Sequence, residues 1–459
     1  MVFEASSPPP ACSENEPRVI NHEIPGVTGK WLEIDSSEVS TEASSTVPSV
    51  KQADDVSGCG FWATVINITK AFVGAASFAL PKAVEDGGLL GASVGIVVLA
   101  FVCHFALSRL ARCSHLVPGS SKPTYPMVGV AALGVCGTVL AWFGMLAMTL
   151  GVCGSFVVFM TSRLQALTGM TEGAALCIMC LVVIVLSWIR SYRLLAYTSF
   201  FGLLALAFAL IVQSIDVFRQ DIVPISELEP FIRPDTYGKF LGNAGFLYLI
   251  STAILPLEQS MQETERPKFS KALAIAMVLV TMLNIPFAVV AYWGYGDCLH
   301  NPSHCVSGLV VDNLPRGMLT DIVNLGLMLD LLFTCIVFLL PMSQLLEKQL
   351  LDEARFGEWT MEVKRNGLRT LLVLSITAVA CGVPVFDMLT GLSGGFGNNI
   401  LGLILPPIFY FLLLRRRGKR VVGVARAMEL TGCIVSVICG LIILALTVIT
   451  FIQQVARFA

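Results

Sequence analysis

The pattern of hydrophobic and polar residues divides this chain into a polar beginning and a long apolar remainder. Residues 1–57 are rich in Ser, Pro and Glu and have little apolar periodicity, which predicts a disordered tail. Beyond it, apolar runs of about 18 residues or more recur, and each is long enough to cross a bilayer as a helix. Together with the charged loops between them, these runs predict eleven spans. The spans lie near 61–84, 88–108, 135–162, 174–189, 194–215, 240–261, 272–295, 318–344, 368–386, 389–414 and 430–453.

The first and sixth spans are interrupted by residues that weaken a helix. The first contains Gly74 and Pro81, and the sixth contains Gly245 and Pro256. Unpaired backbone groups cost several kcal/mol each in lipid, so a broken helix is expected where it lines a cavity or meets a ligand. Paired interruptions at corresponding positions of two halves are typical of the binding site of a secondary transporter. The alternative is that these residues only permit close packing or a kink.

The distribution of basic residues predicts an orientation. Loops that follow even-numbered spans hold 19 Lys and Arg, whereas loops that follow odd-numbered spans, together with the C-terminal end, hold 7. The positive-inside rule therefore places the first set, and with it the N-terminus, in the cytosol. Spans 1 and 6 then run in opposite directions, as in two inverted five-helix repeats. The predicted fold is an all-α membrane protein of 11 transmembrane helices. Its transporter domain covers 58–455, with broken helices 1 and 6, repeats at about 58–216 and 237–414 and an extra helix at about 430–453.

Composition narrows the classes of function. The chain is 55% hydrophobic and 14% charged, which excludes an ordinary soluble globule. A net charge of −2 gives no indication of nucleic-acid binding. No nucleophile with a base, HExxH run, Walker-type glycine loop or metal-ligand cluster stands out, so we expect neither an enzyme nor a bound metal or cofactor. Met1–Pro10 has no basic region followed by an apolar core, so no cleavable signal peptide is expected.

Most of the 14 cysteines lie inside apolar spans, where they behave as small hydrophobic residues. Cys298 and Cys305 differ because they flank a hydrophilic loop, which the predicted orientation places outside the cytosol. A local disulfide is possible in an oxidising compartment. The sequence leaves open whether the two thiols are joined.

The two breaks offer backbone groups to a ligand. Amides at the start of the outer half of span 1 lie at the positive end of a helix dipole, which suits a carboxylate. Carbonyl groups that end the inner half of span 1, and those near the break in span 6, suit an ammonium group. A site that offers amides to a carboxylate and carbonyl oxygens to an ammonium group matches a zwitterionic amino acid. The predicted substrate-binding residues are Phe72, Val73, Gly74, Ala75, Ala76, Ser77, Leu249, Ile250, Ser251 and Thr252.

Several stretches resemble a known family. Asn67–Gly88 (NITKAFVGAASFALPKAVEDGG) is similar to the first-helix signature of the amino acid/auxin permease family. Leu255–Met261 (LPLEQSM), Gly294–Asp297 (GYGD) followed by Asn313–Pro315 (NLP), and Leu405–Pro407 (LPP) agree with the same family in order and spacing. The resemblance covers about residues 58–455 and is strongest to the proton-coupled amino acid transporter branch.

This resemblance implies secondary active transport of amino acids by alternating access. Two positions depart from the family pattern. Ala76 stands where many relatives have a second glycine in the first break, and Ile250 stands where the sixth helix often has glycine. Both departures bear on the size of the substrate and on the extent of unwinding.

Three ionisable residues lie within predicted spans, where a charge is expensive and usually functional. They are Lys70 in span 1, Glu258 in span 6 and Asp330 in span 8. In transporters of this repeat type, spans 1 and 8 are neighbours beneath the substrate. We therefore expect Lys70 to take the place of a sodium ion, paired with Asp330 or with the hydroxyl of Thr334, and coupling to use protons.

Each of these residues has a simpler interpretation. Lys70 and Asp330 can form a static buried pair that fixes the helix register. Glu258 can form a salt bridge with Arg266 or Lys268 near the cytosolic side. The residues alone do not choose between these interpretations and a role in coupling.

The sequence thus predicts a secondary active transporter of small neutral amino acids, coupled to protons. A passive facilitator or exchanger, a sodium-coupled carrier and an amino-acid sensor remain alternatives. The expected partners are the amino acid substrate and the lipid bilayer, with no nucleic acid and a monomer as the functional unit. No cofactor is expected beyond a proton or sodium as coupling ion. The expected location is an integral, multi-pass position in the plasma membrane or in a vacuolar or lysosomal membrane.

Overall fold

The computed structural model describes residues 58–120, 122–189, 192–220, 223–224, 228–248, 250–301, 305–351, 358–383, 385–417 and 424–458. All of them belong to one compact unit, Val56–Ala459. The predicted tail at residues 1–57 lies outside the described residues.

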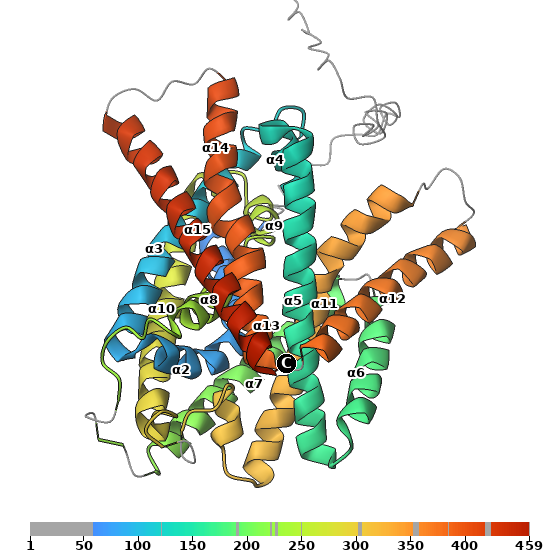
Figure 1. The fold of residues 1–459 in the computed structure, drawn as a ribbon. Helices are drawn as coiled ribbons and strands as arrows, with labels where there is room; N and C mark the ends of the chain where they lie inside the picture. Colours follow the sequence, from blue (N-terminus) through green and yellow to red (C-terminus); the bar gives the residue numbers. More distant parts are fainter. Residues whose placement is uncertain are drawn as a thin grey trace, which may run out of the picture. The chain divides into compact units, whose positions relative to one another are not determined.

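The regular secondary structure of this part of the chain is helical, apart from one isolated β-bridge between Cys59 and Met261 (Figure 1). In chain order the helices are α1 (Phe61–Phe72), α2 (Ala75–Gly87), α3 (Leu89–Ser114), α4 (Tyr125–Leu133), α5 (Val135–Thr168), α6 (Glu172–Ser187), α7 (Tyr192–Val217), α8 (Tyr237–Leu247), α9 (Ile254–Gln259), η3 (Arg266–Lys268), α10 (Phe269–Tyr295), η4 (Val310–Asn313), α11 (Met318–Leu350), α12 (Glu358–Gly382), α13 (Phe386–Leu392), η6 (Ser393–Asn398), η7 (Ile400–Ile404), α14 (Leu405–Arg416) and α15 (Val424–Phe458).

Among the described residues, six helices are long and apolar enough to cross a membrane, and the bent pair α1 and α2 makes a seventh candidate. The remaining predicted spans coincide with α6, α7, α12 and the pair α8 and α9, which are shorter or less apolar. The predicted class of all-α membrane protein is therefore confirmed. The count of eleven spans and their arrangement as inverted repeats stay predictions.

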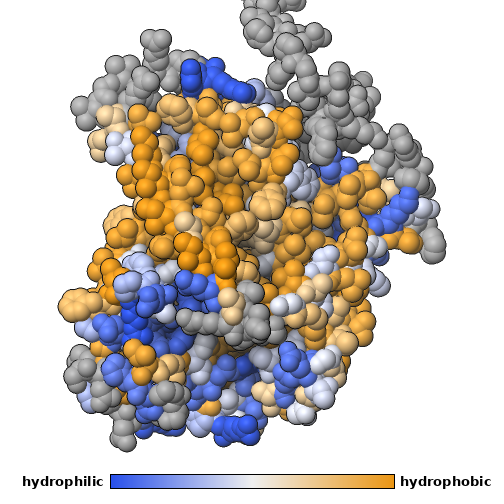
Figure 2. All heavy atoms as spheres, in the orientation of Figure 1, coloured by the Kyte–Doolittle hydropathy of each residue, from blue (hydrophilic) through white to orange (hydrophobic). Residues whose placement is uncertain are grey.

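The apolar helices differ in how much of their surface other helices cover. In α5, 72% of the most apolar stretch is buried, against 28% in α3 and in α15. The large apolar side chains of α3 and α15 that remain exposed include Phe101, Val94 and Ile442. Figure 2 shows hydrophobic side chains covering most of the face that these helices form, with hydrophilic residues gathered toward the ends. A contiguous apolar face of this size indicates contact with lipid, and α5 belongs to the core.

The chain that precedes α1 is joined to the end of α9. The amide of Cys59 donates to the carbonyl oxygen of Ser260 at 2.8 Å, and the amide of Gln262 donates to the carbonyl oxygen of Cys59 at 3.1 Å. These two bonds form the β-bridge. They fix the beginning of the first broken span to the end of the second.

Helix α8 packs backbone to backbone against α13. A Cβ atom placed on Gly242 would lie 2.5 Å from the carbonyl oxygen of Gly391, so only glycine permits this approach. The chain continues from α13 into the π-helical segments η6 and η7, where the sequence is rich in glycine and apolar residues. Wide turns of this kind often mark functional sites in helices.

Candidate functional site

The two interruptions predicted from the sequence lie next to each other. Helix α1 ends at Phe72, and α2, bent by 59° relative to α1, begins two residues after Val73. Helix α8 ends at Leu247, and α9 begins at Ile254. The ring of Phe72 contacts the ring of Tyr248 edge to face, with centroids 5.8 Å apart. The broken ends of both spans therefore meet.

A cavity of about 620 Å³ opens between the breaks and extends along α11 to Lys348. Its wall contains six of the predicted substrate-binding residues: Phe72, Val73, Gly74, Ala76, Ile250 and Thr252. Ser77 and Ser251 are fully buried and do not line the cavity. Leu249 lies outside the described residues, as does the side chain of Ala75.

The first break leaves room for a ligand. Its last inner hydrogen bond joins the amide of Val73 to the carbonyl oxygen of Thr69 at 3.0 Å, and the amide of Ser77 donates to the carbonyl oxygen of Gly74. No atom lies within 4 Å of a Cβ placed on Gly74, although this residue lines the cavity. The positive end of α2, a helix of 13 residues, thus begins at the cavity wall.

The second break is capped by a side chain that the sequence analysis did not select. The Nδ2 atom of Asn398 in η6 donates to the carbonyl oxygens of Gly245 at 3.1 Å and Tyr248 at 3.4 Å. Its Oδ1 atom accepts a bond from the hydroxyl of Ser251 at 2.7 Å. An amide inside an apolar span is a signal that could have identified it, because polar groups at membrane depth are rare without a role.

The backbone of the second break is also satisfied by the chain itself. The carbonyl oxygen of Ile250 accepts bonds from the amides of Ala253 and Ile254, and that of Tyr248 accepts one from the amide of Ile250. In this conformation these carbonyls are therefore already paired. The carbonyls near the first break are the better candidates for an ammonium group.

Lys70 and Asp330 line the same cavity, and so does Thr334. Within the described residues, Lys70 and Asp330 interact electrostatically without forming a direct salt bridge. The hydroxyl of Thr334 donates to the carbonyl oxygen of Asp330 at 2.8 Å. The carboxylate of Asp330 lies against Gly202 of α7, where any larger residue would collide with it. Two residues of opposite charge thus line one cavity.

Glu258 lies outside this cavity and is almost fully buried, with 1% of its surface exposed. Its carboxylate accepts a hydrogen bond from Ser114 at 3.2 Å and contacts Nε2 of His115 at 3.1 Å. The alternative partners proposed from the sequence are wrong. The guanidinium of Arg266 donates to backbone carbonyls at the end of α9, and Lys268 pairs with Glu265 at 2.8 Å.

The GYGD motif builds a structural junction at the end of α10. The carboxylate of Asp297 forms an ion pair with Arg233 and accepts bonds from the hydroxyl of Tyr292 at 2.7 Å and the amide of Leu299 at 2.8 Å. Burial alone would raise the pKa of Asp297, but these bonds outweigh it and lower the pKa below its ordinary value. Cys298, the next residue, forms a disulfide with Cys305 (S–S 2.13 Å).

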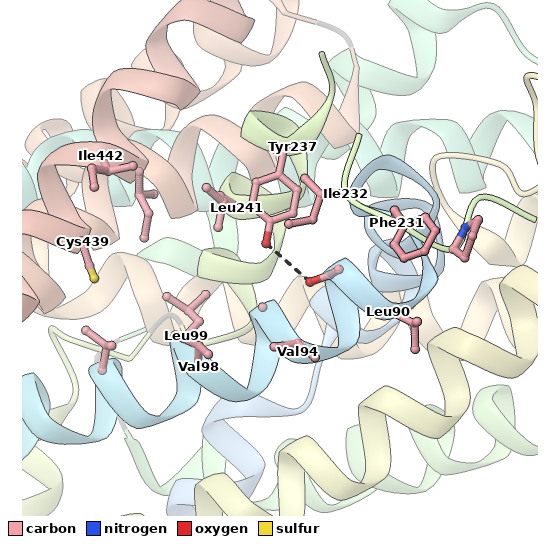
Figure 3. A pocket seen from close by; sticks show the side chains of 15 residues that line it. Leu90, Val94, Val98, Leu99, Phe231, Ile232, Tyr237, Leu241, Cys439 and Ile442 are labelled. Atoms are coloured by element: carbon pink, nitrogen blue, oxygen red, sulfur yellow. Dashed lines mark hydrogen bonds between the residues drawn. The ribbon is translucent and has the colours of Figure 1, made fainter. Parts of the chain in front are cut away.

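A second cavity, of about 470 Å³, lies between α3, α8, α15 and the segment around Phe231 (Figure 3). None of the fifteen residues that line it carries a charge. The hydroxyl of Tyr237 is directed to the carbonyl oxygen of Gly91 at 3.4 Å. A zwitterion would lose its hydration there without gaining partners, so this cavity is not the amino-acid site.

Nowhere in the described part of the chain do three or more His, Cys, Asp or Glu side chains come together in a way that could hold a metal. The prediction that no metal is bound concerns the whole chain and stays a prediction.

Comparison with known proteins identifies the family. A model of the family described as transmembrane amino acid transporter protein matches residues 57–455. Amino acid transporter ANT1 and amino acid transporter AVT3C, both from Arabidopsis thaliana, are each 24% identical; the alignments cover 76% and 77% of this chain and 84% and 83% of those proteins. Vacuolar amino acid transporter 3 from Schizosaccharomyces pombe is 23% identical, over 76% of this chain and 52% of its own length.

Among solved structures, the crystal structure of the Eremococcus coleocola manganese transporter in complex with an aromatic bis-isothiourea substituted compound is 12% identical. It aligns with a TM-score of 0.46 over 89% of this chain and 97% of that one.

The matching relatives are transporters, which confirms the prediction that the chain is not an enzyme. Amino acid transport and a multi-pass position in a lipid membrane follow from the same match. The family model covers nearly all of the helical unit, and the paired breaks that carried the resemblance lie inside it. This chain belongs to the family of transmembrane amino acid transporter proteins.

Proposed function

We propose that the protein is a secondary active transporter of small neutral amino acids that works by proton-coupled symport and alternating access. The observation that supports this most strongly is the cavity between the two breaks, which Lys70 and Asp330 both line. Membership of an amino acid transporter family supports the substrate class.

The cavity suits a zwitterion with an uncharged side chain. The substrate carboxylate binds at the N-terminus of α2, where Gly74 leaves space, and the ammonium group binds the carbonyls that end α1. Phe156, Phe246 and Phe338 pack edge to face and line the cavity, so an apolar side chain is favoured over a charged one.

Coupling rests on Lys70. Its ammonium group lies one helical turn before Gly74 and shares the cavity wall with Asp330 and Thr334, where it acts as a fixed cation in place of sodium. The driving ion is then the proton, bound and released by ionisable groups of the chain. A sodium-coupled carrier or a passive exchanger would use the same cavity, and a sensor would bind the same ligand. Only functional measurements can distinguish these alternatives from a proton-coupled symporter.

The remaining parts of the proposal concern topology. Two inverted repeats, at about 58–216 and 237–414, supply eleven spans together with α15, and the N-terminus lies in the cytosol. The protein acts as a monomer in the plasma membrane or in a vacuolar or lysosomal membrane. One relative carries the word vacuolar in its name, which supports the second location.

Uptake into proteoliposomes tests the function. A panel of radiolabelled amino acids is offered at fixed membrane voltage, with and without a pH gradient and with sodium replaced. We expect accumulation of small neutral amino acids that needs the pH gradient and not sodium. Accumulation that needs sodium and ignores pH would make the protein a sodium-coupled carrier.

Lys70→Ala separates a coupled transporter from a passive exchanger, with Lys271→Ala as the matched control at an exposed position of α10. We expect pH-driven accumulation to fall on the order of tenfold or more in Lys70→Ala, because the opposite charge that interacts with Asp330 across the cavity is removed. The control should retain full uptake. Unchanged accumulation in Lys70→Ala would remove Lys70 from the coupling mechanism.

A further inference from the structure

Two carboxyl groups that are near enough to interact electrostatically lie at the end of the helical unit that the cavity does not reach. Asp86 is the second-last residue of α2, and Asp387 is the second residue of α13. The two groups act on each other electrostatically, and neither lines the cavity. With a rise of about 1.5 Å per residue, Asp86 lies about 18 Å along α2 from the break at Gly74.

The carboxyl group of Asp86 lacks the partners that a buried anion needs. The residue is 5% exposed, and its Oδ2 atom is buried without a hydrogen-bond partner. Its backbone carbonyl, in contrast, accepts a bond from the hydroxyl of Thr236 at 2.6 Å. An ionised carboxylate in this position would pay the full cost of desolvation, which makes the neutral form the better fit.

The environment of Asp387 is built to hold one charge. Its Oδ1 atom accepts a hydrogen bond from Nδ2 of Asn243 in α8, and Oδ1 of Asn243 is bonded in turn by the hydroxyl of Thr390 at 2.8 Å. Gly308, just before η4, lies beside the residue, since a Cβ placed there would lie 3.7 Å from the Cβ of Asp387. Asp387 therefore has a hydrogen-bond donor where Asp86 has none.

The other charged groups around the pair do not neutralise both acids. Those that act on Asp86 are Lys82 and Glu85 on its own helix and Lys239 on α8; Lys82 and Lys239 also act on Asp387. Lys82 is already paired with Glu85 at 2.5 Å. Asp312 of η4, which also packs against α2, is paired with Arg163. One lysine, Lys239, remains to balance two carboxyl groups.

We propose that Asp86 and Asp387 form a proton-binding site that holds one proton between them and thereby keeps this end of the transporter closed. The proton comes from water on that side and protonates one carboxylate, and it returns to water when the groups separate. Two like charges near each other, one of them on a buried residue, cannot both be ionised at low cost, so the proton is needed for α2 and α13 both to pack on α8. This proposal rests on the proposed proton-coupled transport. It adds the residues that bind the proton at the end of the helical unit that the cavity does not reach.

Infrared difference spectroscopy tests proton binding without any need for a transported substrate. The purified full-length protein is compared between about pH 5 and about pH 8, and the carbonyl stretch of protonated carboxyl groups is recorded. We expect a band that persists to neutral pH in the parent protein and is lost in Asp86→Asn. In Asp387→Asn the band should persist only to a lower pH, because the repulsion between the two carboxyl groups is gone while the burial of Asp86 remains. Asp321→Asn, at an exposed position on α11, is the matched control and should keep the band.

Uptake of radiolabelled L-alanine as probe supplies the second readout. The parent protein should show an uptake ratio between the two pH values on the order of tenfold, and each Asn variant a ratio near one. A band that survives in both variants overturns the proposal, and so does an unchanged uptake ratio after the band is lost. Both variants are nearly isosteric, and thermal melting verifies their folding. If the parent transports no amino acid, the proposed function fails while the spectrum still decides whether the pair binds a proton.

Discussion

A single glycine controls the space at the first break. Gly74 lines the cavity, and a Cβ placed on it would meet nothing within 4 Å. Its backbone, with φ −173° and ψ −148°, is extended, so a side chain can be added without strain. In the proposed binding mode, a larger residue would therefore occupy the place of the substrate and leave the fold intact.

This predicts a graded loss of transport at Gly74. Gly74→Ala should raise the KM for the preferred amino acid, and Gly74→Val should reduce uptake by more than about tenfold, since each added methyl group fills space needed by the ligand. Thermal stability should change little. Gly173→Val, at an exposed site in α6 that is equally open, is the control and should transport normally. Full uptake by Gly74→Val would place the substrate elsewhere.

At the residue scale, two of the three intramembrane charges that the sequence singles out, Lys70 and Asp330, line the cavity, whereas Glu258 does not. Lys70 and Asp330 could be selected because a charge within an apolar span stands out in any hydropathy profile. The partners of buried groups could not be selected in this way. His115, the residue that follows α3, contacts Glu258 in α9, and only the packing of α3 against α9 brings them together.

At the scale of elements, both breaks were predictable because glycine and proline interrupt otherwise continuous apolar runs. Their lengths were not. The first break is two residues long, whereas α8 and α9 are separated by six residues, 248–253. The longer break depends on Asn398, which lies about 150 residues away in sequence and satisfies the freed carbonyls of Gly245 and Tyr248.

Replacing Asn398 should disrupt the sixth span. Asn398→Ala removes the donor to two carbonyls and the acceptor for Ser251. Each buried group left unsatisfied lowers the free energy of unfolding by about 1–3 kcal/mol. We expect a lower melting temperature in detergent and loss of uptake. Asn398→Asp keeps an acceptor for Ser251 but sets a buried carboxylate against two carbonyl oxygens, so it should be at least as unstable as Asn398→Ala. Asn366→Ala, a substitution of the same kind on α12 and outside the cavity, should leave uptake unchanged. Wild-type uptake by Asn398→Ala would contradict a role of Asn398 in holding the break open.

At the scale of the whole helical unit, the two ends differ in a way that alternating access requires. Toward one end, the cavity extends from the breaks along α11 to Lys348. Toward the other end, α8 and α13 are in backbone contact at Gly242 and Gly391, and the cavity does not continue between them. Transport by alternating access needs a second conformation in which these ends exchange roles.

Helix α11 offers a direct test of the predicted topology and of access to the cavity, because its two ends lie at opposite ends of the helical unit. Asp321 lies near its start and Lys348 near its end, about 40 Å apart at 1.5 Å per residue. We expect Lys348→Cys to react with a membrane-impermeant maleimide from the cytosolic side, and Asp321→Cys from the opposite side, each measured above the labelling of the parent chain. A saturating transported amino acid should slow labelling of Lys348→Cys, which lines the cavity, and leave Asp321→Cys unaffected. Labelling of both cysteines from the same side would contradict the predicted topology, because a single spanning helix cannot place both of its ends in one compartment.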